Sequence, residues 1–398
     1  MDSSLATFRR ELEDCLNNNI LRYWIDRMTD PRGGFYGRRD GYDRLDAEAE
    51  KGGILNARIL WSFAAAYRHN GKPEYADAAL RARDYIRDHF IDKEYGGTYW
   101  SLDADGNPID TRKQFYAIAF TIYGLSEHYR AVGDEESLRI AQNIFADIEK
   151  HSRDLVKDGY VEAKTRDWQP IADMRLSDKD DNASKTMNTH LHIMEGYTSL
   201  LRVWRDPALL EATTNLLRIF LDRILDKETW HLGLFFDDDW HRQDHIFSYG
   251  HDIEASWLML ETAMVINDKA LLSETLAATE KIAYAALEGR REEGSMVYER
   301  HSDGSLDGDF HWWVQAEDVI GQLYLALYHK KPEFIGKAAE SWGYIKDNLL
   351  DTENGEWYWS RRGSDGSINR EDDKAGFWKC PYHNSRMCIE AIETLEKL

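Results

Sequence analysis

The sequence predicts an all-α protein, an (α/α)6 barrel in which six outer helices surround six inner helices. Three observations along the 398-residue chain predict it. A turn that combines glycine with aromatic residues recurs roughly every sixty to seventy-five residues. A strongly apolar segment with helical periodicity follows each turn, and a more charged, amphipathic segment leads to the next one. Each repeat therefore encodes one helix pair.

The glycine-aromatic turns have the composition of tight hairpins. They are GGFYG at Gly33, YGGTYW at Tyr95, DGYVEA at Asp158, LGLFFDDDW at Leu232, GSMVYER at Gly294 and NGEWYWSR at Asn354. We expect short β-hairpins here, all at one rim of the barrel. Our interpretation places that rim opposite the starts of the inner helices.

The apolar segments are the predicted inner helices, because apolar residues cover most of their surface. They span residues 52–68, 113–130, 187–204, 248–260, 311–328 and 382–398. Amphipathic segments such as residues 73–90 and 134–151 are predicted outer helices. The N-terminal segment supplies the outer helix of the final repeat.

Helix pairs of this kind can close into a ring or continue as an open superhelix. The chain has seven prolines and no long linker rich in proline, serine or glycine. This favours one closed barrel domain over residues 1–398.

The composition of the chain excludes several classes of function. A formal net charge of −22 argues against a nucleic-acid or anionic membrane surface and suits a neutral ligand. Cys15, Cys380 and Cys388 are too few for a disulfide framework, and neither a signal peptide nor a membrane-spanning apolar run is visible. No phosphate loop or dinucleotide motif occurs. We therefore expect a cytoplasmic protein, a monomer or weak dimer, that binds a small molecule and needs no cofactor.

Polar and aromatic residues occupy the first turns of all six predicted inner helices. They are Arg58, Tyr116, Asn188 with His190, His251 with Glu254, Trp312 and Trp313 with Glu317, and His383 with Arg386. All six starts are expected at one mouth of the barrel, and such residues on otherwise apolar helices are hard to explain as core packing. The sequence therefore predicts a binding or catalytic pocket at this mouth.

His251 and Glu254 form the most suggestive pair. Positions three apart share a helix face, so we expect the Glu254 carboxylate to reach the imidazole and orient a general base with a pKa near neutrality. Alternatively, Glu254 only complements the helix dipole and His251 is incidental.

The same residues are also compatible with a metal site, a packed core or a surface loop. His190 and His192 point to different faces of one helix, so we expect no metal site and assign His192 a structural role. Adjacent Trp312 and Trp313 cannot both point inward, so at least one should line the mouth, where an indole stacks on a sugar ring. The charged residues 173–184 form a solvated loop or a lid. Cys380 shows no sign of being a nucleophile.

The strings KGGILNARILW, MNTHLH, SYGHDIEASWL, WWVQAE and FWKCPYHNSRMC resemble those of the cellobiose 2-epimerases, within the N-acylglucosamine 2-epimerase family. The resemblance covers nearly the whole chain and implies the same six-fold helical barrel. It implies that His251 and His383 are an acid/base pair, that Glu254 supports His251, and that Arg58 and His190 hold substrate oxygens. It further implies hydrogen bonds to the sugar from Tyr116, Asn188 and Glu317, and sugar stacking by Trp312, Trp313 and Trp378.

The reaction so implied is inversion of C2 in the reducing sugar of a β-1,4-linked disaccharide such as cellobiose, lactose or mannobiose, by proton transfer through an enediolate. A mannose or glucose 2-epimerase, or an aldose–ketose isomerase, remains an alternative. A glycoside hydrolase would need a flanking carboxylate pair, for which Glu254 and Glu317 are the candidates. A non-catalytic interaction protein is the remaining class, although no heptad seam supports it.

Overall fold

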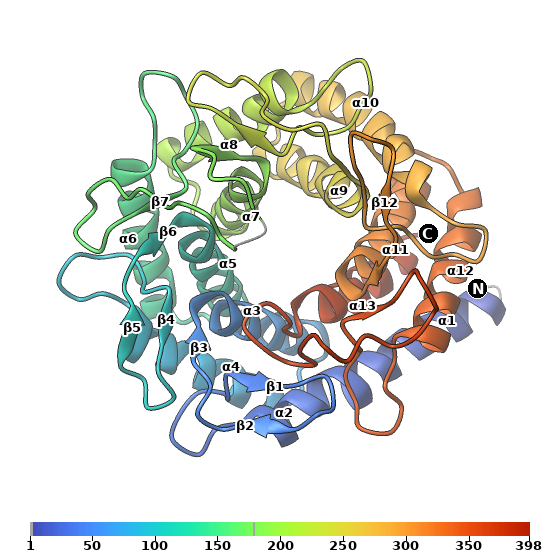
Figure 1. Cartoon of the computed structure of the whole chain (residues 1–398), viewed down its shortest axis with the longest axis horizontal. Helices are drawn as coiled ribbons and strands as arrows, with labels where there is room; N and C mark the ends of the chain where they lie inside the picture. Colours follow the sequence, from blue (N-terminus) through green and yellow to red (C-terminus); the bar gives the residue numbers. More distant parts are fainter. Residues whose placement is uncertain (1–2, 178–179) are drawn as a thin grey trace.

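The computed structural model describes residues 3–177 and 180–398. Its helices form two concentric rings (Figure 1). Within the described residues the inner ring consists of α3 (Gly53–Asn70), α5 (Phe115–Val132), α7 (Met187–Val203), α9 (Tyr249–Ile266), α11 (Trp312–Leu327) and α13 (Tyr382–Leu395). These bounds agree with the predicted inner segments, so the (α/α)6 prediction is confirmed.

The inner helices are buried on nearly every side. In α3, for example, every residue from Gly53 to Ala66 is buried, as an apolar helix enclosed by other helices requires. Each inner helix contacts the next, and α13 contacts α3. The ring is therefore closed, and the open superhelix is wrong. Over the part of the chain that the structure describes, no helix is long and apolar enough to cross a bilayer.

The outer ring covers this core with amphipathic helices. It contains α4 (Pro73–Tyr85) with the π-helical turn η2 (Ile86–Phe90), α6 (Glu135–His151), α8 (Pro207–Ile219) with η3 (Phe220–Ile224), α10 (Lys269–Ala286) ending in the 3-10 turn η4 (Leu287–Gly289), and α12 (Glu333–Asn348). The chain begins with α1 (Ser3–Asp14), η1 (Cys15–Leu21) and α2 (Arg22–Met28), of which α1 and η1 pack against α13. The N-terminal segment thus completes the last repeat, as predicted.

Short antiparallel strands connect the repeats. The pairs are β1 (Arg38–Arg39) with β2 (Leu45–Asp46); β3 (Lys51–Gly52) with β4 (Ser101–Leu102) and then β5 (Pro108–Asp110); β6 (Lys113–Gln114) with β7 (Ala163–Lys164); β8 (Lys185–Thr186) with β9 (Phe235–Phe236); β10 (Phe247–Ser248) with β11 (Glu299–Arg300) and then β12 (Leu306–Asp307); and β13 (Phe310–His311) with β14 (Ser360–Arg361). A bridge between Arg39 and Ala375 joins the first hairpin to the loop before α13.

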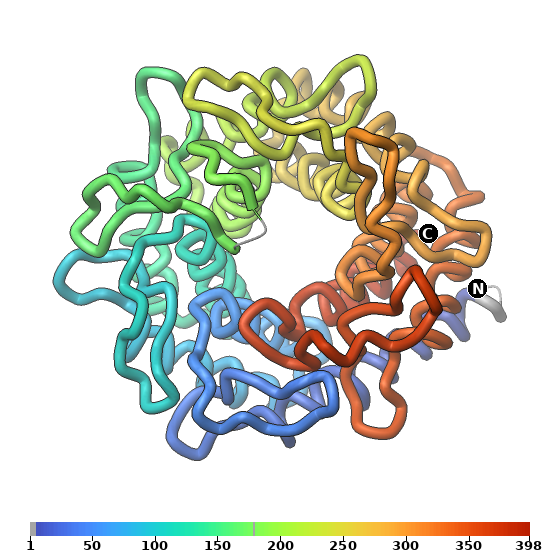
Figure 2. Tube along the Cα trace, viewed as in Figure 1, coloured from blue at the N-terminus to red at the C-terminus, as the bar shows by residue number. Residues whose placement is uncertain are grey.

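The hairpins lie at the rim where the inner helices start, so the prediction of opposite rims is wrong. Strand β3 ends at Gly52 and α3 begins at Gly53, and β8 and β10 lead into α7 and α9 in the same way. A two-residue strand joined directly to a helix cannot reach the other end of the barrel. Figure 2 shows these connections together at the face nearest the viewer.

Buried ion pairs hold several of these strands in place. In three repeats, a lysine in the strand before the inner helix forms an ion pair with an aspartate in the preceding turn. The Nζ–carboxylate distances are 2.8 Å for Lys51–Asp30, 2.8 Å for Lys113–Asp92 and 2.9 Å for Lys185–Asp154. The same ammonium groups donate to carbonyl oxygens, as in Lys51 to Gly33 at 3.1 Å. These contacts tie the start of an inner helix to a rigid hairpin. They set where the first helical turns lie.

Candidate active site

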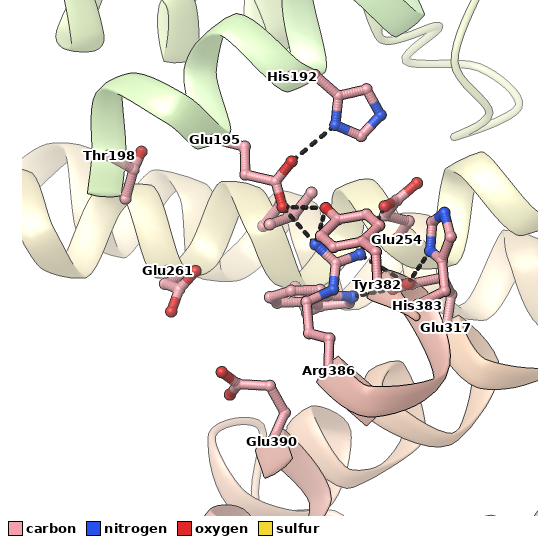
Figure 3. A network of polar contacts seen from close by, with 12 residues as sticks. His192, Glu195, Thr198, Glu254, Glu261, Glu317, Tyr382, His383, Arg386 and Glu390 are labelled. Atoms are coloured by element: carbon pink, nitrogen blue, oxygen red, sulfur yellow. Dashed lines mark hydrogen bonds and ion pairs between the residues drawn. The ribbon is translucent and has the colours of Figure 1, made fainter. Parts of the chain in front are cut away.

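An arginine surrounded by carboxylates lies at the centre of the inner helices (Figure 3). Arg386 of α13 donates through Nη2 to Glu254 of α9 at 2.7 Å and to Glu317 of α11 at 2.6 Å. Its Nη1 contacts Glu195 of α7 and the hydroxyl of Tyr382. One guanidinium therefore joins four of the six inner helices.

This arrangement leaves more buried carboxylates than cations. Burial and the neighbouring Glu317 raise the pKa of Glu254, whereas Glu195 and Glu317 stay ionised because Arg386 outweighs the burial that opposes it. Ligand atoms of Glu254, Glu317 and His383 lie within 4.8 Å of one another, close enough to share a metal ion. The guanidinium of Arg386, however, already bonds the carboxylates of Glu254 and Glu317. In this structure the cation paired with these two carboxylates is therefore an arginine side chain.

His383 has a carboxylate partner. Its Nδ1 lies 2.7 Å from Oε1 of Glu317, whose other oxygen accepts from Nε1 of Trp257 at 2.9 Å. Since an ionised carboxylate only accepts, Nδ1 of His383 carries the hydrogen and Nε2 is left with a lone pair. Burial lowers the pKa of His383 to about 3, so the ring is neutral at ordinary pH.

His251 has a different partner from the one expected. Its Nδ1 lies 2.8 Å from Oγ of Ser248, and Glu254 pairs with Arg386 instead. The expectation that Glu254 orients His251 is therefore wrong, because helical side chains lean toward the N-terminus and the ring reaches back to Ser248. Burial lowers the pKa of His251 to about 3, which also corrects the expected value near neutrality.

Trp313 packs against both histidines. Its ring centroid is 4.8 Å from that of His251 and 5.6 Å from that of His383, and the side chain is partly exposed. Trp312 is 3% exposed and packs on Trp359 at 4.6 Å, so it belongs to the core and not to the mouth. As predicted, the two tryptophans point in different directions.

Arg58 and Tyr116 form a second polar group at the helix starts. Nη2 of Arg58 donates to the Tyr116 hydroxyl at 2.7 Å, and the guanidinium lies 4.2 Å from the ring centroid of Phe120. Within the described chain the buried Nε of Arg58 has no hydrogen-bond partner. Trp378 is half-buried beside Tyr116, with 6.1 Å between ring centroids. Tyr116 thus contacts both a permanent positive charge and an aromatic side chain in the loop before α13.

The structure reverses the roles expected for the two histidines of α7. His190 is fully buried, with Nδ1 2.6 Å from the Thr186 carbonyl oxygen and Nε2 accepting from the Tyr160 N–H at 3.0 Å. Both ring nitrogens are used by the backbone, so His190 is a packing residue and the prediction that it holds substrate is wrong.

His192 is the histidine that faces the central network. Its Nδ1 lies 2.7 Å from Oε2 of Glu195, and its ring centroid is 5.0 Å from that of Tyr116. One signal in the sequence could have found it: Asn188 and His192 are four residues apart and share a helix face. Asn188 is half-buried and its Oδ1 has no partner in the described structure.

Two further expectations concern loops. In residues 173–184, the carbonyl oxygens of Met174 and Arg175 accept from Nε2 of Gln114 at 3.2 and 2.9 Å, which ties the segment to the rim. Residues 178–179 of this segment lie outside the described structure, so the lid stays a prediction.

Cys380 is fully buried and burial raises the pKa of its thiol, which agrees with its having no nucleophilic role.

Comparison with known proteins gives consistent matches. The model of the family N-acylglucosamine 2-epimerase (GlcNAc 2-epimerase) matches residues 34–385. The chain is 54% identical to a cellobiose 2-epimerase of Bacteroides fragilis, over 96% of this chain and 98% of that protein. It is 38% identical to a cellobiose 2-epimerase of Ruminococcus albus, over 98% of both chains. The solved structure of the cellobiose 2-epimerase from Bacillus thermoamylovorans superposes with a TM-score of 0.92 at 38% identity, covering 98% of this chain and 99% of that one.

Proposed function

Because the chain belongs to the N-acylglucosamine 2-epimerase family and is a carbohydrate epimerase, we propose that it inverts C2 of the reducing-end sugar of a β-1,4-linked disaccharide. Cellobiose is the first substrate to test, and lactose and mannobiose share the same linkage. The observation that carries the proposal is the pair of neutral imidazoles of His251 and His383, both packed against Trp313.

The chemistry needs a base and an acid on opposite faces of C2. After the sugar ring opens, the hydrogen on C2 is acidic because it is adjacent to the C1 aldehyde. Nε2 of His383 has a lone pair that removes this proton and leaves a planar enediolate. Nε2 of His251 returns a proton from the other face. Transfers of this kind are typically worth about a hundredfold to ten-thousandfold in rate.

The enediolate oxygens need a positive partner in surroundings with little water. Arg58 supplies it: the guanidinium is buried, permanently charged and has an unpaired Nε among the described residues. His192 lies beside Tyr116, whose hydroxyl accepts from Arg58. We assign His192 the role of binding a substrate hydroxyl, in place of His190.

Aromatic side chains account for sugar binding. The reducing sugar stacks on Trp313 between the histidines, and the second sugar extends toward Trp378, next to Tyr116. Glu317 acts by orienting His383, and Glu254 pairs with Arg386. Side chains alone supply the proton transfers and charge stabilisation in this scheme.

The test is incubation with cellobiose in heavy water, followed by NMR and chromatography of the products. We expect glucosyl-mannose that carries deuterium at C2. Release of glucose would indicate a hydrolase, a ketose would indicate an isomerase, and turnover of free mannose or glucose alone would indicate a monosaccharide enzyme. An inert protein would support a non-catalytic role.

Variants then test the two histidines. His251→Ala and His383→Ala should each lose nearly all epimerisation while circular dichroism shows an intact fold. His241→Ala is the matched control, because this histidine is exposed and pairs with the nearby Asp237 at 2.9 Å. Turnover like that of the wild type in either active-site variant would refute the assignment.

A further inference from the structure

Ser248 connects His251 to a carboxyl group outside the central network. It ends strand β10 and lies directly opposite Glu299 of β11 in the antiparallel register. Side chains of directly opposed residues lie on the same face of a sheet. Glu299 and Ser248 are thus cross-strand neighbours, and Oγ of Ser248 lies 2.8 Å from Nδ1 of His251. A carboxyl, a hydroxyl and an imidazole thus follow one another.

The surroundings of Glu299 are acidic. Asp307 of β12 lies directly opposite it, and the charge of Asp180 acts on it from the rim loop. Burial and these negative neighbours raise the pKa of Glu299 to about 7, although the nearby polar groups of Ser248 and Tyr298 oppose the rise. The next residue, Arg300, extends over the ring of Phe247 at 4.5 Å. Both protonation states of Glu299 are therefore accessible near neutral pH.

The imidazoles of His251 and His383 differ in the group that hydrogen-bonds to Nδ1. For His383 it is the carboxylate of Glu317, which can only accept a hydrogen bond. For His251 it is the hydroxyl of Ser248, which can donate or accept. The charged and titratable groups that act on His251 from other helices are His192 and Glu317. The tautomer of His383 is thus set, whereas that of His251 can alternate.

We propose that Glu299 is a positioning residue that exchanges a proton with Nδ1 of His251 through the hydroxyl of Ser248. Nε2 of His251 then alternates between proton donor and proton acceptor. The part of this inference that concerns catalysis rests on the proposed epimerisation.

Each proton in the relay has a donor and an acceptor. When Glu299 is protonated, its O–H donates to Ser248 and the Ser248 O–H donates to Nδ1, so Nε2 of His251 carries a hydrogen. As that hydrogen moves to C2 of the enediolate, Nδ1 takes the proton of Ser248, and Ser248 takes the proton of Glu299. Glu299 ends as a carboxylate and His251 remains neutral. The proton originally on C2 is on Nε2 of His383, whose positive charge is stabilised by Glu317.

The first experiment follows the tautomer of His251 without substrate. In protein with ¹⁵N-labelled histidine, the signal of His251 is the one lost in His251→Gln. We expect Nε2–H at pH 5.5 and Nδ1–H at pH 8.5, with a midpoint near the pKa of Glu299 at about 7. Glu299→Gln and Ser248→Ala should abolish the change, whereas Ser248→Thr, which keeps the hydroxyl, should retain it.

Asp307→Asn gives a second test in case Glu299→Gln does not fold. Asp307→Asn leaves the relay intact but removes a negative neighbour of Glu299, so the midpoint should move to lower pH. A single tautomer across the pH range in the wild type would overturn the proposal. So would an unchanged titration in Glu299→Gln, or no shift of the midpoint in Asp307→Asn.

The second experiment measures kcat and KM for cellobiose. Glu299→Gln should lower kcat about tenfold or more and change KM by about twofold at most, because Glu299 does not touch the sugar. Ser248→Thr, which keeps the hydroxyl, should restore most of the kcat that Ser248→Ala loses. A lowered affinity with unchanged kcat would contradict a relay. If the wild-type protein does not epimerise cellobiose, the proposed function fails, while the tautomer titration still decides whether the relay exists.

Discussion

Substituting His190 and His192 separately tests the assignment of the two histidines of α7. In His190→Ala, the N–H of Tyr160 loses the acceptor that now lies at 3.0 Å, and an unpaired buried donor costs about 1–3 kcal/mol. The imidazole also packs on Trp240, with 5.2 Å between ring centroids, and the cavity left behind costs about 2 kcal/mol more. The free energy of unfolding should therefore fall by about 3–5 kcal/mol.

The packing around His190 supports this magnitude. Gly159, at a φ of 89°, is so close that a Cβ there would lie 2.9 Å from Nε2 of His190 and 2.4 Å from the Trp240 ring. Neighbours this tightly arranged cannot relax fully into a new cavity. At a temperature where the variant is folded, kcat/KM for cellobiose should be close to the wild-type value.

His192→Ala should lose activity as well as stability. Oε2 of Glu195 loses its hydrogen-bond partner, which costs about 1–3 kcal/mol, while Oε1 stays bonded to Arg386 and Tyr382. Because the ring faces the reacting centre, kcat/KM should fall about a hundredfold or more.

Urea unfolding followed by far-ultraviolet circular dichroism, together with initial rates on cellobiose, measures both effects. The reasoning is refuted if His190→Ala keeps wild-type stability but loses activity. It is equally refuted if His192→Ala behaves like the wild type in both assays.

Three further predictions follow from the same geometry. Trp378→Ala should weaken binding of cellobiose by about 1–3 kcal/mol, seen as a raised KM, and affect any activity on mannose much less; an equal loss on both sugars would refute a second-sugar site. Glu317→Gln should lower kcat about a hundredfold or more, because an amide can donate to Nδ1 of His383 and invert its tautomer; an unchanged kcat would remove Glu317 from the scheme. In the Glu299→Gln variant, kcat/KM should be constant from pH 7 down to pH 5. Burial lowers the pKa of both His251 and His383 to about 3, so neither ring gains a proton in this range. A decline in kcat/KM beginning near pH 6.5 would contradict this.

Local patterns in the sequence were enough to predict the helices. The segment 113–130 was expected to be an inner helix and α5 spans Phe115–Val132, because hydrophobic periodicity is a property of the segment itself. The closed ring followed from the number of repeats and from the N-terminal segment that completes the last one. Candidate residues at the helix starts were found for the same reason, since the repeat places those starts at one end.

Only the tertiary structure decided which of those residues meet. His190 and His192 are equally plausible in sequence, and the rotation of α7 in the ring determines which of them faces Glu195 and which faces Tyr160. Glu254 lies one helical turn from His251, yet its partner Arg386 is 132 residues away. A buried carboxylate is stabilised most by a cation, and only closure of the barrel brings α13 to α9 so that this charge is available. Periodicity within a segment therefore determined the helices, whereas the packing of distant segments determined the site.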